Sequence, residues 1–453
     1  MTWLLAILAF IACLLGPAAT PEPAPRPNII LITIEATRRD HCSLYGYERE
    51  TTPFLEELAE ESIVFDNGWS HSSWTYPSMA SVFSGRLPHE HGVYHAYTAP
   101  TADVLPWLGS LHEAGYATGA FTTNRWVARL LGESTKFTAC RAETTWRGNI
   151  ECDARELLRR TLAWLDRSGS EPWFVFWHAF DPHAPYDAPG GMRDIFAGDY
   201  DGPMSRRELL PKYLNSRDQF SSEEADYLVA RYDAEIRYTD AALRDFVQEL
   251  RARGAWENTL LIVTADHGEA SGGGKWGHGG PPLPATTAVP FLVRLPGGRR
   301  GGERSSDVVG GIDILPTLLE AAGLPVPDDL PGRNLVALLD APQPEHVHYV
   351  QQTAVELVSE QENTYRVDSS GYALVRGTRF FRFVEYPDAS TVEALHEVTL
   401  QGERQISDSS YDPWRQALGA QPAYPGFPAG GVFDSTQESA KEVLATLRDL
   451  GYL

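Results

Sequence analysis

The chain has 453 residues, 43% hydrophobic and 22% charged, which is the composition of an ordinary globular protein with a large core. Its length leaves room for two or three domains. The formal net charge is −23, and basic residues gather only in isolated pairs such as Arg299 and Arg300. This excludes a nucleic-acid binder, which needs a basic face. An anionic substrate would therefore have to be held by a local site, most economically by a metal ion.

Two segments precede the first predicted strand. Residues 1–19 form an apolar run that is short for a membrane span and typical of a signal peptide, although it lacks Lys and Arg. An uncleaved N-terminal anchor and lipidation at Cys13 are alternatives. Residues 20–27 form a Pro-rich spacer. We expect an exported protein, periplasmic or extracellular, with membrane attachment through the N-terminus as an open alternative.

Three cysteines follow this leader. Cys140 and Cys152 bracket a short polar stretch, and in an oxidising compartment we expect them to close a loop disulfide. The alternative is two unpaired thiols. Cys42 is predicted to be a small buried apolar residue. No pair has the close CxxC spacing of a thiolate metal site.

Strand and helix patterns alternate over residues 28–340 and predict an α/β catalytic domain whose sheet is flanked by helices. The predicted strands cover residues 28–34, 173–178, 259–264 and 289–294, and the predicted helices cover residues 53–62, 153–168, 222–253 and 311–323. Residues 341–453 are expected to form a smaller α+β C-terminal subdomain. Its patterns are a strand at 346–352, a hairpin within 372–386 and an amphipathic segment at 440–450.

Polar side chains follow the ends of several predicted strands, where an open α/β sheet binds its ligands. Glu35 ends the first strand, Asp266 and His267 end the strand at 259–264, and His183 follows the strand at 173–178. Thr75 precedes a helical pattern with a proline in its first turn. Its hydroxyl is thus predicted at a helix N-terminus, where an anion is favoured.

A threonine hydroxyl is a poor nucleophile unless a base or a metal activates it. Glu35, Asp266 and His267 could hold one divalent metal ion together with the oxygen of Thr75. This mixed set of oxygen and nitrogen ligands favours Zn²⁺ or Mn²⁺, with Ca²⁺ or Mg²⁺ less well matched. Each residue also has a structural alternative: a threonine before a helix is often an N-cap, and strand-end acids often form turns.

Several motifs together resemble the sulfatases of the alkaline-phosphatase superfamily over most of residues 28–453. They are SWTYPSMASVFSG, DPHAPY, RYDAEIRYTD, TADHGE followed by KWGHGG, GIDILPTLLEAAG and the final LRDLGYL. The resemblance implies a central mixed sheet flanked by helices, a small C-terminal α+β subdomain and metal-dependent cleavage of an ester.

The chain departs from the sulfatase pattern at its nucleophile. Sulfatases carry Cys-x-Pro-x-Arg, whose cysteine becomes formylglycine, whereas the same positions here contain Thr75, Pro77 and Met79. Formylglycine cannot form at this position. Asn124 lies where many sulfatases have a Lys-Trp-His clamp, so part of the positive charge is replaced by a neutral amide. The first strand ends in Glu35 rather than paired aspartates.

The combination of Glu, Thr, Asp and His is similar to the metal set of the superfamily's phosphotransferases, such as phosphoethanolamine transferases and lipoteichoic-acid synthases, which form a phosphothreonine. The resemblance further implies that His183 is a general acid near the leaving group. His278 takes the place of a lysine that contacts the anion. Lys275 and Arg38 are candidate substrate-binding cations, as Asn124 is a candidate neutral contact, although a structural ion pair is an equal alternative for Arg38.

Three functions therefore compete. The first is an exported hydrolase or transferase of anionic esters, preferably phosphate, through Thr75. The second is a sulfatase that works without formylglycine. The third is a catalytically silent binding protein that keeps the fold. The expected partner is a small-molecule, glycan or lipid ester, and the sequence leaves its organic part open.

Overall fold

The structure is a computed structural model. It describes residues 26–94, 100, 104–105, 107–132, 139–142, 152–169, 172–200, 220–272, 275–280, 282–343, 346, 348–359, 364–376, 379–385, 396–399, 402–405 and 432–434. Within the strands after residue 350, and in the strand at 139–142, the backbone is described but most side chains are not.

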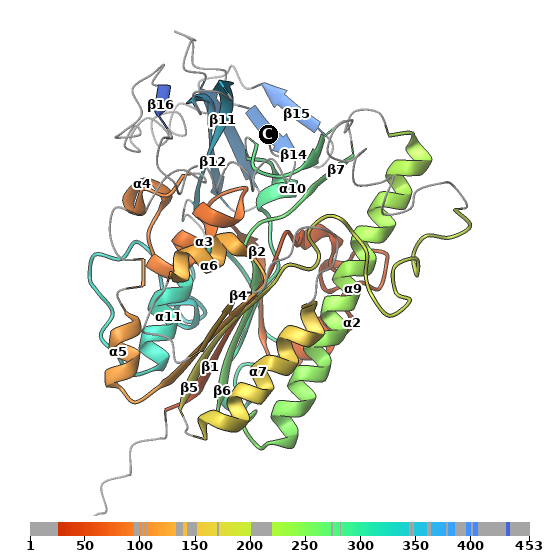
Figure 1. Ribbon diagram of the computed structural model, residues 1–453. Helices are drawn as coiled ribbons and strands as arrows, with labels where there is room; N and C mark the ends of the chain where they lie inside the picture. Colours follow the sequence, from red (N-terminus) through yellow and green to blue (C-terminus); the bar gives the residue numbers. More distant parts are fainter. Residues whose placement is uncertain are drawn as a thin grey trace, which may run out of the picture.

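An eight-stranded sheet forms the centre of the molecule (Figure 1), and its strand order is β10-β2-β9-β6-β1-β5-β3-β4. Its pairs are parallel except those of β9, which runs antiparallel to β6 and β2, so the sheet is mixed. The strands are β1 (Asn28–Ile34), β2 (Ile63–Trp69), β3 (Ala117–Thr122), β4 (Ala139–Ala142), β5 (Trp173–Ala179), β6 (Thr259–Ala265), β9 (Phe291–Arg294) and β10 (Arg304–Gly310). A separate hairpin pairs β7 (Ala270–Gly272) with β8 (Lys275–Gly277).

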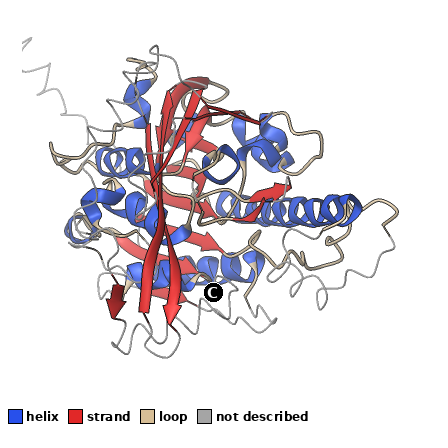
Figure 2. Ribbon diagram, turned by 90° about the horizontal axis from the view of Figure 1, so that it is seen from above, coloured by secondary structure: helices blue, strands red, loops and turns tan. Residues whose placement is uncertain are grey.

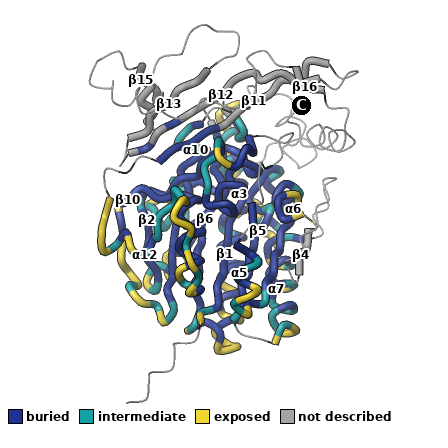
Figure 3. Tube along the Cα trace, turned by 90° about the vertical axis from the view of Figure 1, so that its left-hand side faces the viewer, coloured by how far each residue is buried: buried dark blue, intermediate teal, exposed yellow. Residues whose placement is uncertain are grey.

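Both faces of the sheet are buried because its central strands are continuously apolar. Alternate residues of β1 enter different cores: Ile29 and Leu31 join one cluster, while Ile30, Ile32 and Ile34 join the other. Figure 3 shows β1, β5 and β6 as dark blue, buried segments. This arrangement leaves the ends of these strands as the place where polar groups can gather.

Helices cover the two faces. Side chains of α3, α5, α6, α11 and α12 belong to the first cluster, and those of α2, α7 and α9 belong to the second. The longest is α9, the long blue helix of Figure 2. The α-helices are α2 (Pro53–Ala59), α3 (Thr75–Ser84), α4 (Pro88–His91), α5 (Leu108–Glu113), α6 (Arg125–Leu131), α7 (Ala154–Ser168), α9 (Ser222–Ala252), α10 (Pro284–Thr287), α11 (Ile314–Ala321) and α12 (Leu335–Leu338). The 3₁₀-helices are η1 (Arg39–His41), η2 (Ser43–Tyr45), η4 (Pro296–Gly298) and η5 (Gly311–Asp313).

A second, antiparallel sheet follows in the chain, with the order β11-β12-β13-β14-β15 and β16 paired to β12. Its strands are β11 (His348–Ser359), β12 (Thr364–Arg376), β13 (Arg379–Glu385), β14 (His396–Thr399), β15 (Gly402–Gln405) and β16 (Val432–Asp434). Val350, Ala373 and Val375 of this sheet pack with Trp69 and Val308, at the ends of β2 and β10.

The predicted fold class, a mixed α/β sheet between helices, is confirmed. The expected strand at 289–294 begins only at Phe291, since Pro290 precedes it, and it runs antiparallel. The expected helix at 53–62 ends at Ala59, and the one at 311–323 is divided into η5 and α11. The strand β2 was not predicted, because its sequence contains the polar Asp66 and Asn67.

Three expectations fall partly or wholly outside the described residues: the leader at 1–19, the spacer at 20–27 apart from its last two residues, and the segment at 440–450. The disulfide also stays a prediction, since the side chain of Cys140 is not described, although Cys42 and Cys152 are both buried. Among the described helices, none is both long and apolar enough to cross a membrane.

Candidate active site

Glu35 is the first residue after β1, and a tight turn directs its carboxylate into the site. The next residue, Ala36, has a φ of 50°, a left-handed conformation that costs alanine about 1–2 kcal/mol. Two hydrogen bonds hold it: its N–H donates to Asp266 Oδ1 at 3.0 Å, and its carbonyl accepts from the Tyr232 hydroxyl at 2.7 Å. The turn is therefore fixed by side chains from β6 and α9.

Thr75 is the first residue of α3, at the N-terminus where the sequence predicted it. The N-cap of this helix is Trp74, so the alternative that Thr75 serves as the N-cap is wrong. The Thr75 hydroxyl donates to Glu35 Oε1 at 3.2 Å and lies 3.1 Å from His267 Nε2. The helix α3 is buried along its length. Even so, the Thr75 hydroxyl contacts polar side chains that follow β1 and β6.

Asp266 and His267 follow β6 directly. Asp266 Oδ1 accepts from the N–H groups of Ala36, at 3.0 Å, and His267, at 2.8 Å, whereas its Oδ2 is buried with no hydrogen-bond partner. His267 Nδ1 lies 2.7 Å from the carbonyl of Gly268, which can only accept, so Nδ1 carries the proton. The lone pair of His267 Nε2 therefore faces Thr75 and Asp266.

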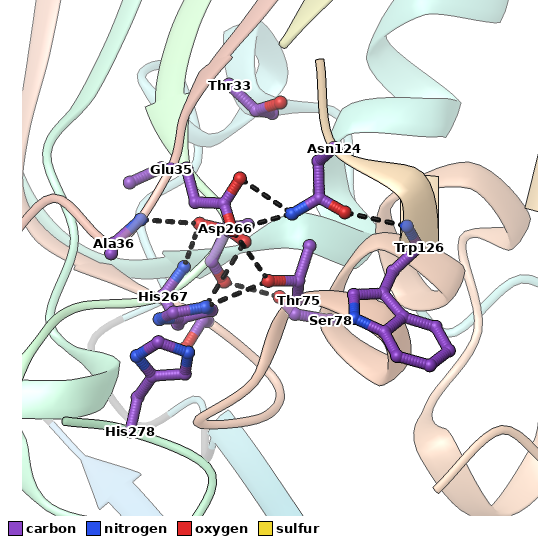
Figure 4. Close-up of polar contacts among 12 residues, drawn as sticks. Thr33, Glu35, Ala36, Thr75, Ser78, Asn124, Trp126, Asp266, His267 and His278 are labelled. Carbon is purple, nitrogen blue, oxygen red and sulfur yellow. Dashed lines mark hydrogen bonds and ion pairs between the residues drawn. The ribbon is translucent and has the colours of Figure 1, made fainter. Parts of the chain in front are cut away.

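These residues fit a divalent metal ion. Glu35, Asp266 and His267 are buried, and each offers one ligand atom within 4.8 Å of the others (Figure 4). Two buried carboxylates repel each other unless a cation lies between them, and the unpartnered Asp266 Oδ2 is an atom that a metal would satisfy. The mixture of oxygen and imidazole nitrogen suits Zn²⁺ or Mn²⁺ better than an all-oxygen Ca²⁺ site.

Asn124, the N-cap of α6 just after β3, and His178 of β5 surround the Glu35 carboxylate. Asn124 Nδ2 donates to both Glu35 oxygens, at 2.6 and 2.7 Å, as Figure 4 shows. His178 Nε2 lies 3.0 Å from Glu35 Oε2, and its Nδ1 lies 2.6 Å from Thr33 Oγ1. Asn124, predicted as a substrate contact, thus binds a candidate metal ligand.

Glu35 and His178 form a charged pair. Burial alone would raise the pKa of Glu35, but the hydrogen bond from His178 and its positive charge outweigh burial and lower that pKa. Burial would likewise lower the pKa of His178, but the bond to Glu35 and its negative charge raise it. Both directions favour the carboxylate with the imidazolium, so Glu35 stays ionised as a ligand should.

Two further histidines lie beside His267. The ring of His278 is 4.3 Å from the ring of His267 and 4.9 Å from that of His183. His278 Nδ1 lies 3.1 Å from Glu269 Oε1, and His183 Nδ1 lies 2.7 Å from the carbonyl of Ala184. In both rings Nδ1 contacts an oxygen outside the metal set, and Nε2 is the nitrogen on the other side of the ring. The structure thus brings His183 and His278 together with the predicted metal ligands.

The two predicted cations, Arg38 and Lys275, lie on the turn after β1 and on β8. Arg38 is buried and directs Nε and Nη2 to Asp40, while its Nη1 donates to the carbonyl of Glu269 and to Ser271 Oγ. The structural ion pair, which the sequence left as an alternative, therefore forms. Lys275 lies on β8, and its side chain is not among those described.

The sequence did not predict His178 and Glu269 as site residues. His178 lies within the apolar strand β5. It pairs in register with Thr33 of the neighbouring strand β1, two residues before Glu35, and this pairing brings it to the site. Glu269 reaches His278 because β7 and β8 form a hairpin between them. A polar residue in an otherwise apolar buried strand, and a second acid in the Asp-His-Gly-Glu run, are the signals that could have identified them.

Comparison with known proteins agrees with this geometry. The sequence profile of the Sulfatase family matches residues 27–324, more than half of the chain. The chain belongs to the sulfatase family. A second profile, N-sulphoglucosamine sulphohydrolase, C-terminal, matches residues 284–391. The sulfatase resemblance drawn from the motifs is thereby confirmed, and the protein is a sulfatase-like ester hydrolase.

Individual relatives are distant. An arylsulfatase of Clostridium perfringens is 24% identical over 86% of this chain and 89% of its own length. Among solved structures, the phosphonate monoester hydrolase SpPMH from Silicibacter pomeroyi has a TM-score of 0.67 at 20% identity, covering 87% of this chain and 94% of that one. The C-terminal periplasmic domain of EcEptC from Escherichia coli, solved in complex with Zn, has a TM-score of 0.51 at 18% identity, covering 66% and 83%. These structural likenesses show the fold.

Proposed function

We propose that this sulfatase-family protein is an exported, metal-dependent hydrolase or transferase of anionic esters, with phosphate esters preferred, and that Thr75 is its covalent nucleophile. The observation that carries the proposal is the position of the Thr75 hydroxyl, within 3.2 Å of Glu35 Oε1 and 3.1 Å of His267 Nε2. The Zn complex of the fold relative EcEptC supports a single Zn²⁺ or Mn²⁺ ion on Glu35, Asp266 and His267. The apolar leader supports export.

The bound metal ion would lower the pKa of the Thr75 hydroxyl and polarise the ester oxygens. In the first step, the Thr75 Oγ1, which would have released its proton to solvent on metal binding, attacks phosphorus, and a new Thr75–phosphorus bond forms as the bond to the leaving alcohol breaks. His183 or His278 gives a proton to that alcohol oxygen through Nε2. Water, or a second alcohol, then displaces Thr75 from phosphorus and returns a proton to its oxygen.

The charge around Thr75 favours an ester with a single negative charge, such as a phosphodiester. Met79, at the position of the family's arginine, is fully buried in the apolar core and offers no charge. Asn124 is neutral and bound to Glu35, and Arg38 is paired with Asp40. With these groups, the described site has less fixed positive charge than a dianionic phosphate monoester would need.

A sulfatase that works without formylglycine is the second candidate, because curated relatives include arylsulfatases and sulfate esters carry the same single charge. A silent binding protein is less well supported. Burying the Glu35 and Asp266 carboxylates together, with Asp266 Oδ2 lacking a hydrogen-bond partner, costs stability that a binding protein without a metal would not recover.

The test compares wild-type protein with Thr75→Ala, Thr75→Ser and Asp266→Ala on an aryl phosphodiester, an aryl phosphate and an aryl sulfate, each after addition of Zn²⁺ or Mn²⁺. We expect the phosphodiester to be cleaved fastest. Thr75→Ala should lower kcat about 10³-fold or more, while Thr75→Ser, which keeps a hydroxyl, should retain part of the activity. Asp266→Ala should lose bound metal and activity together.

Metal content and thermal unfolding of each variant separate lost chemistry from lost folding. Equal turnover by wild-type protein and Thr75→Ala would refute the nucleophile. A faster reaction with the aryl sulfate would instead support the second candidate.

A further inference from the structure

Before any metal is considered, hydrogen-bonding groups fill all the acceptor positions of the Glu35 carboxylate, one of them through the Thr75 hydroxyl, itself a member of the candidate metal set. An ionised carboxylate can accept about four hydrogen bonds, two at each oxygen. Oε2 already has the Asn124 amide at 2.7 Å and His178 Nε2 at 3.0 Å. Oε1 has the Asn124 amide at 2.6 Å and the Thr75 hydroxyl at 3.2 Å. Only Oε1 therefore faces the atoms of the metal set.

The two groups that occupy Glu35 are themselves fixed in orientation. Asn124 is the N-cap of α6, and its Oδ1 accepts from the N–H groups of Trp126, at 2.7 Å, and Val127, at 3.3 Å. A flipped amide would lose both bonds, so Nδ2 must face Glu35. His178 is held by Thr33, its register partner on β1, through a contact of 2.6 Å.

Asp266 is restricted in the same way. Its Oδ1 accepts from two backbone N–H groups, whereas Oδ2 has no hydrogen-bond partner and lies 3.3 Å from His267 Nε2. Together with His267 Nε2 and Thr75 Oγ1, the two carboxylates thus present four donor atoms. Zn²⁺ takes four ligands in most protein sites, whereas Ca²⁺ takes six to eight oxygens and often uses both oxygens of a carboxylate.

We propose that Asn124 and His178 are positioning residues that restrict Glu35 to one ligand oxygen and thereby make this site select Zn²⁺ over Ca²⁺. The inference rests on the proposed function, since it requires a metal ion on Glu35, Asp266 and His267. It adds the residues that determine which ion is held. They act on the metal through Glu35, at distances of 2.6–3.0 Å from its oxygens.

Four variants isolate this role. Asn124→Ser removes the amide donor and keeps a side chain that caps a helix well, so α6 should persist. His178→Ala removes the second donor, and His178→Gln restores an N–H group near the place of Nε2. The matched control is Asn334→Ala, because Asn334 also caps a helix and also donates to a glutamate, Glu320, away from the site.

The measurements are Zn²⁺ and Ca²⁺ affinity by competition titration, and the visible spectrum of protein loaded with Co²⁺, whose absorption is intense in four-coordinate sites and weak at higher coordination. Asn124→Ser and His178→Ala should each weaken Zn²⁺ binding about 10- to 100-fold, the usual effect of losing a residue that orients a metal ligand. The Zn²⁺/Ca²⁺ affinity ratio should fall, and the Co²⁺ absorption should weaken. His178→Gln should lie closer to wild type, and Asn334→Ala should match wild type.

Two outcomes would overturn the inference. An unchanged Zn²⁺/Ca²⁺ ratio and Co²⁺ spectrum in both Asn124→Ser and His178→Ala would show that Asn124 and His178 do not set the selectivity, while the proposed function would stand. Wild-type protein that binds none of Zn²⁺, Co²⁺ and Mn²⁺ would overturn the proposed function, and the inference with it. Circular dichroism of each variant confirms that the fold is retained.

Discussion

At the scale of single residues, the site depends on the turn between Glu35 and Asp40. Ala36 is held in a left-handed conformation, and Tyr232 of α9 bridges the turn. The Tyr232 hydroxyl donates to the Ala36 carbonyl at 2.7 Å and accepts from the Arg38 N–H at 2.9 Å. One buried phenol thus satisfies two backbone groups next to a candidate metal ligand.

Tyr232→Phe should therefore lower the free energy of unfolding by about 1–3 kcal/mol, because two buried backbone groups lose their partner. It should also weaken metal binding, since the turn that carries Glu35 is no longer held. Urea unfolding and Zn²⁺ titration measure the two effects. The control is Tyr116→Phe, which removes one hydroxyl bond, to the carbonyl of Pro27, on a chain segment before β1. Equal metal affinity in both variants would speak against the role of Tyr232.

The four candidate metal-site residues could be selected from the sequence because each has a local signal. Glu35 and Asp266 end apolar strands, His267 follows Asp266, and Thr75 precedes a helix pattern. The prediction that these residues lie close together relied on the expectation that parallel strands end at the same edge of the sheet. His178 had no such signal, since only the pairing of β1 with β5 brings it to Glu35.

At the scale of elements, α9 and α2 are joined by a buried acid. Asp240 of α9 accepts hydrogen bonds from the N–H groups of Phe54, at 2.9 Å, and Leu55, at 3.0 Å. These are N–H groups in the first turn of α2, where no intrahelical partner exists. Asp240, on another helix, therefore supplies the hydrogen-bond acceptor that an N-cap side chain usually provides. Thr52, the N-cap residue of α2, makes no such bond.

Asp240→Ala should lower the free energy of unfolding by about 3 kcal/mol, because two buried N–H groups lose their acceptor. Ser221→Ala, which removes the exposed N-cap of α9, should cost only about 1 kcal/mol. Urea unfolding of the two variants gives the comparison. Equal losses would show that the contact between α9 and α2 stabilises the protein no more than an exposed N-cap does.

Element positions were predictable where one pattern dominated. The capping signal at Ser221 and the long apolar period behind it located α9 within one residue of its end, and β1 has the predicted bounds. The direction of β9 was not predictable, because a short apolar run is compatible with both a parallel and an antiparallel buried strand. The division of the segment at 311–323 into η5 and α11 depends on Asp313, which accepts from the N–H of Gly310, a contact that no periodicity reveals.

At the scale of the whole molecule, the second sheet meets the nucleophile segment through two buried histidines. His71, four residues before Thr75, and His348 of β11 stack with their ring centroids 4.1 Å apart. His71 Nδ1 lies 2.8 Å from the carbonyl of Tyr349, and His348 Nε2 lies 3.1 Å from that of Ser70. Burial lowers the pKa of His71 to about 4, which the bond to Tyr349 only partly offsets.

This junction should make the protein sensitive to acid. The folded pKa of His71 lies below the ordinary value of 6.5, so its contribution to stability is fully present above pH 6.5 and is lost as the pH falls toward 4. The loss amounts to about 3 kcal/mol. His71→Asn keeps a donor for Tyr349 and cannot take up a proton, so its free energy of unfolding should fall less between pH 6.5 and 4.

Urea unfolding at a series of pH values tests this, with His112→Asn, a change at a histidine outside the junction, as the control. The expectation fails if wild type and His71→Asn lose the same stability over that interval.

The central claim, that Thr75 becomes covalently linked to the substrate, is tested most directly by trapping that link. Wild-type protein loaded with Zn²⁺ is mixed with bis(4-nitrophenyl) phosphate, quenched in acid and digested for peptide mass spectrometry. We predict the aryl-phosphoryl group on Thr75, and its absence in Thr75→Ala and Asp266→Ala. A label on any other residue, or wild-type turnover by Thr75→Ala, would contradict the account.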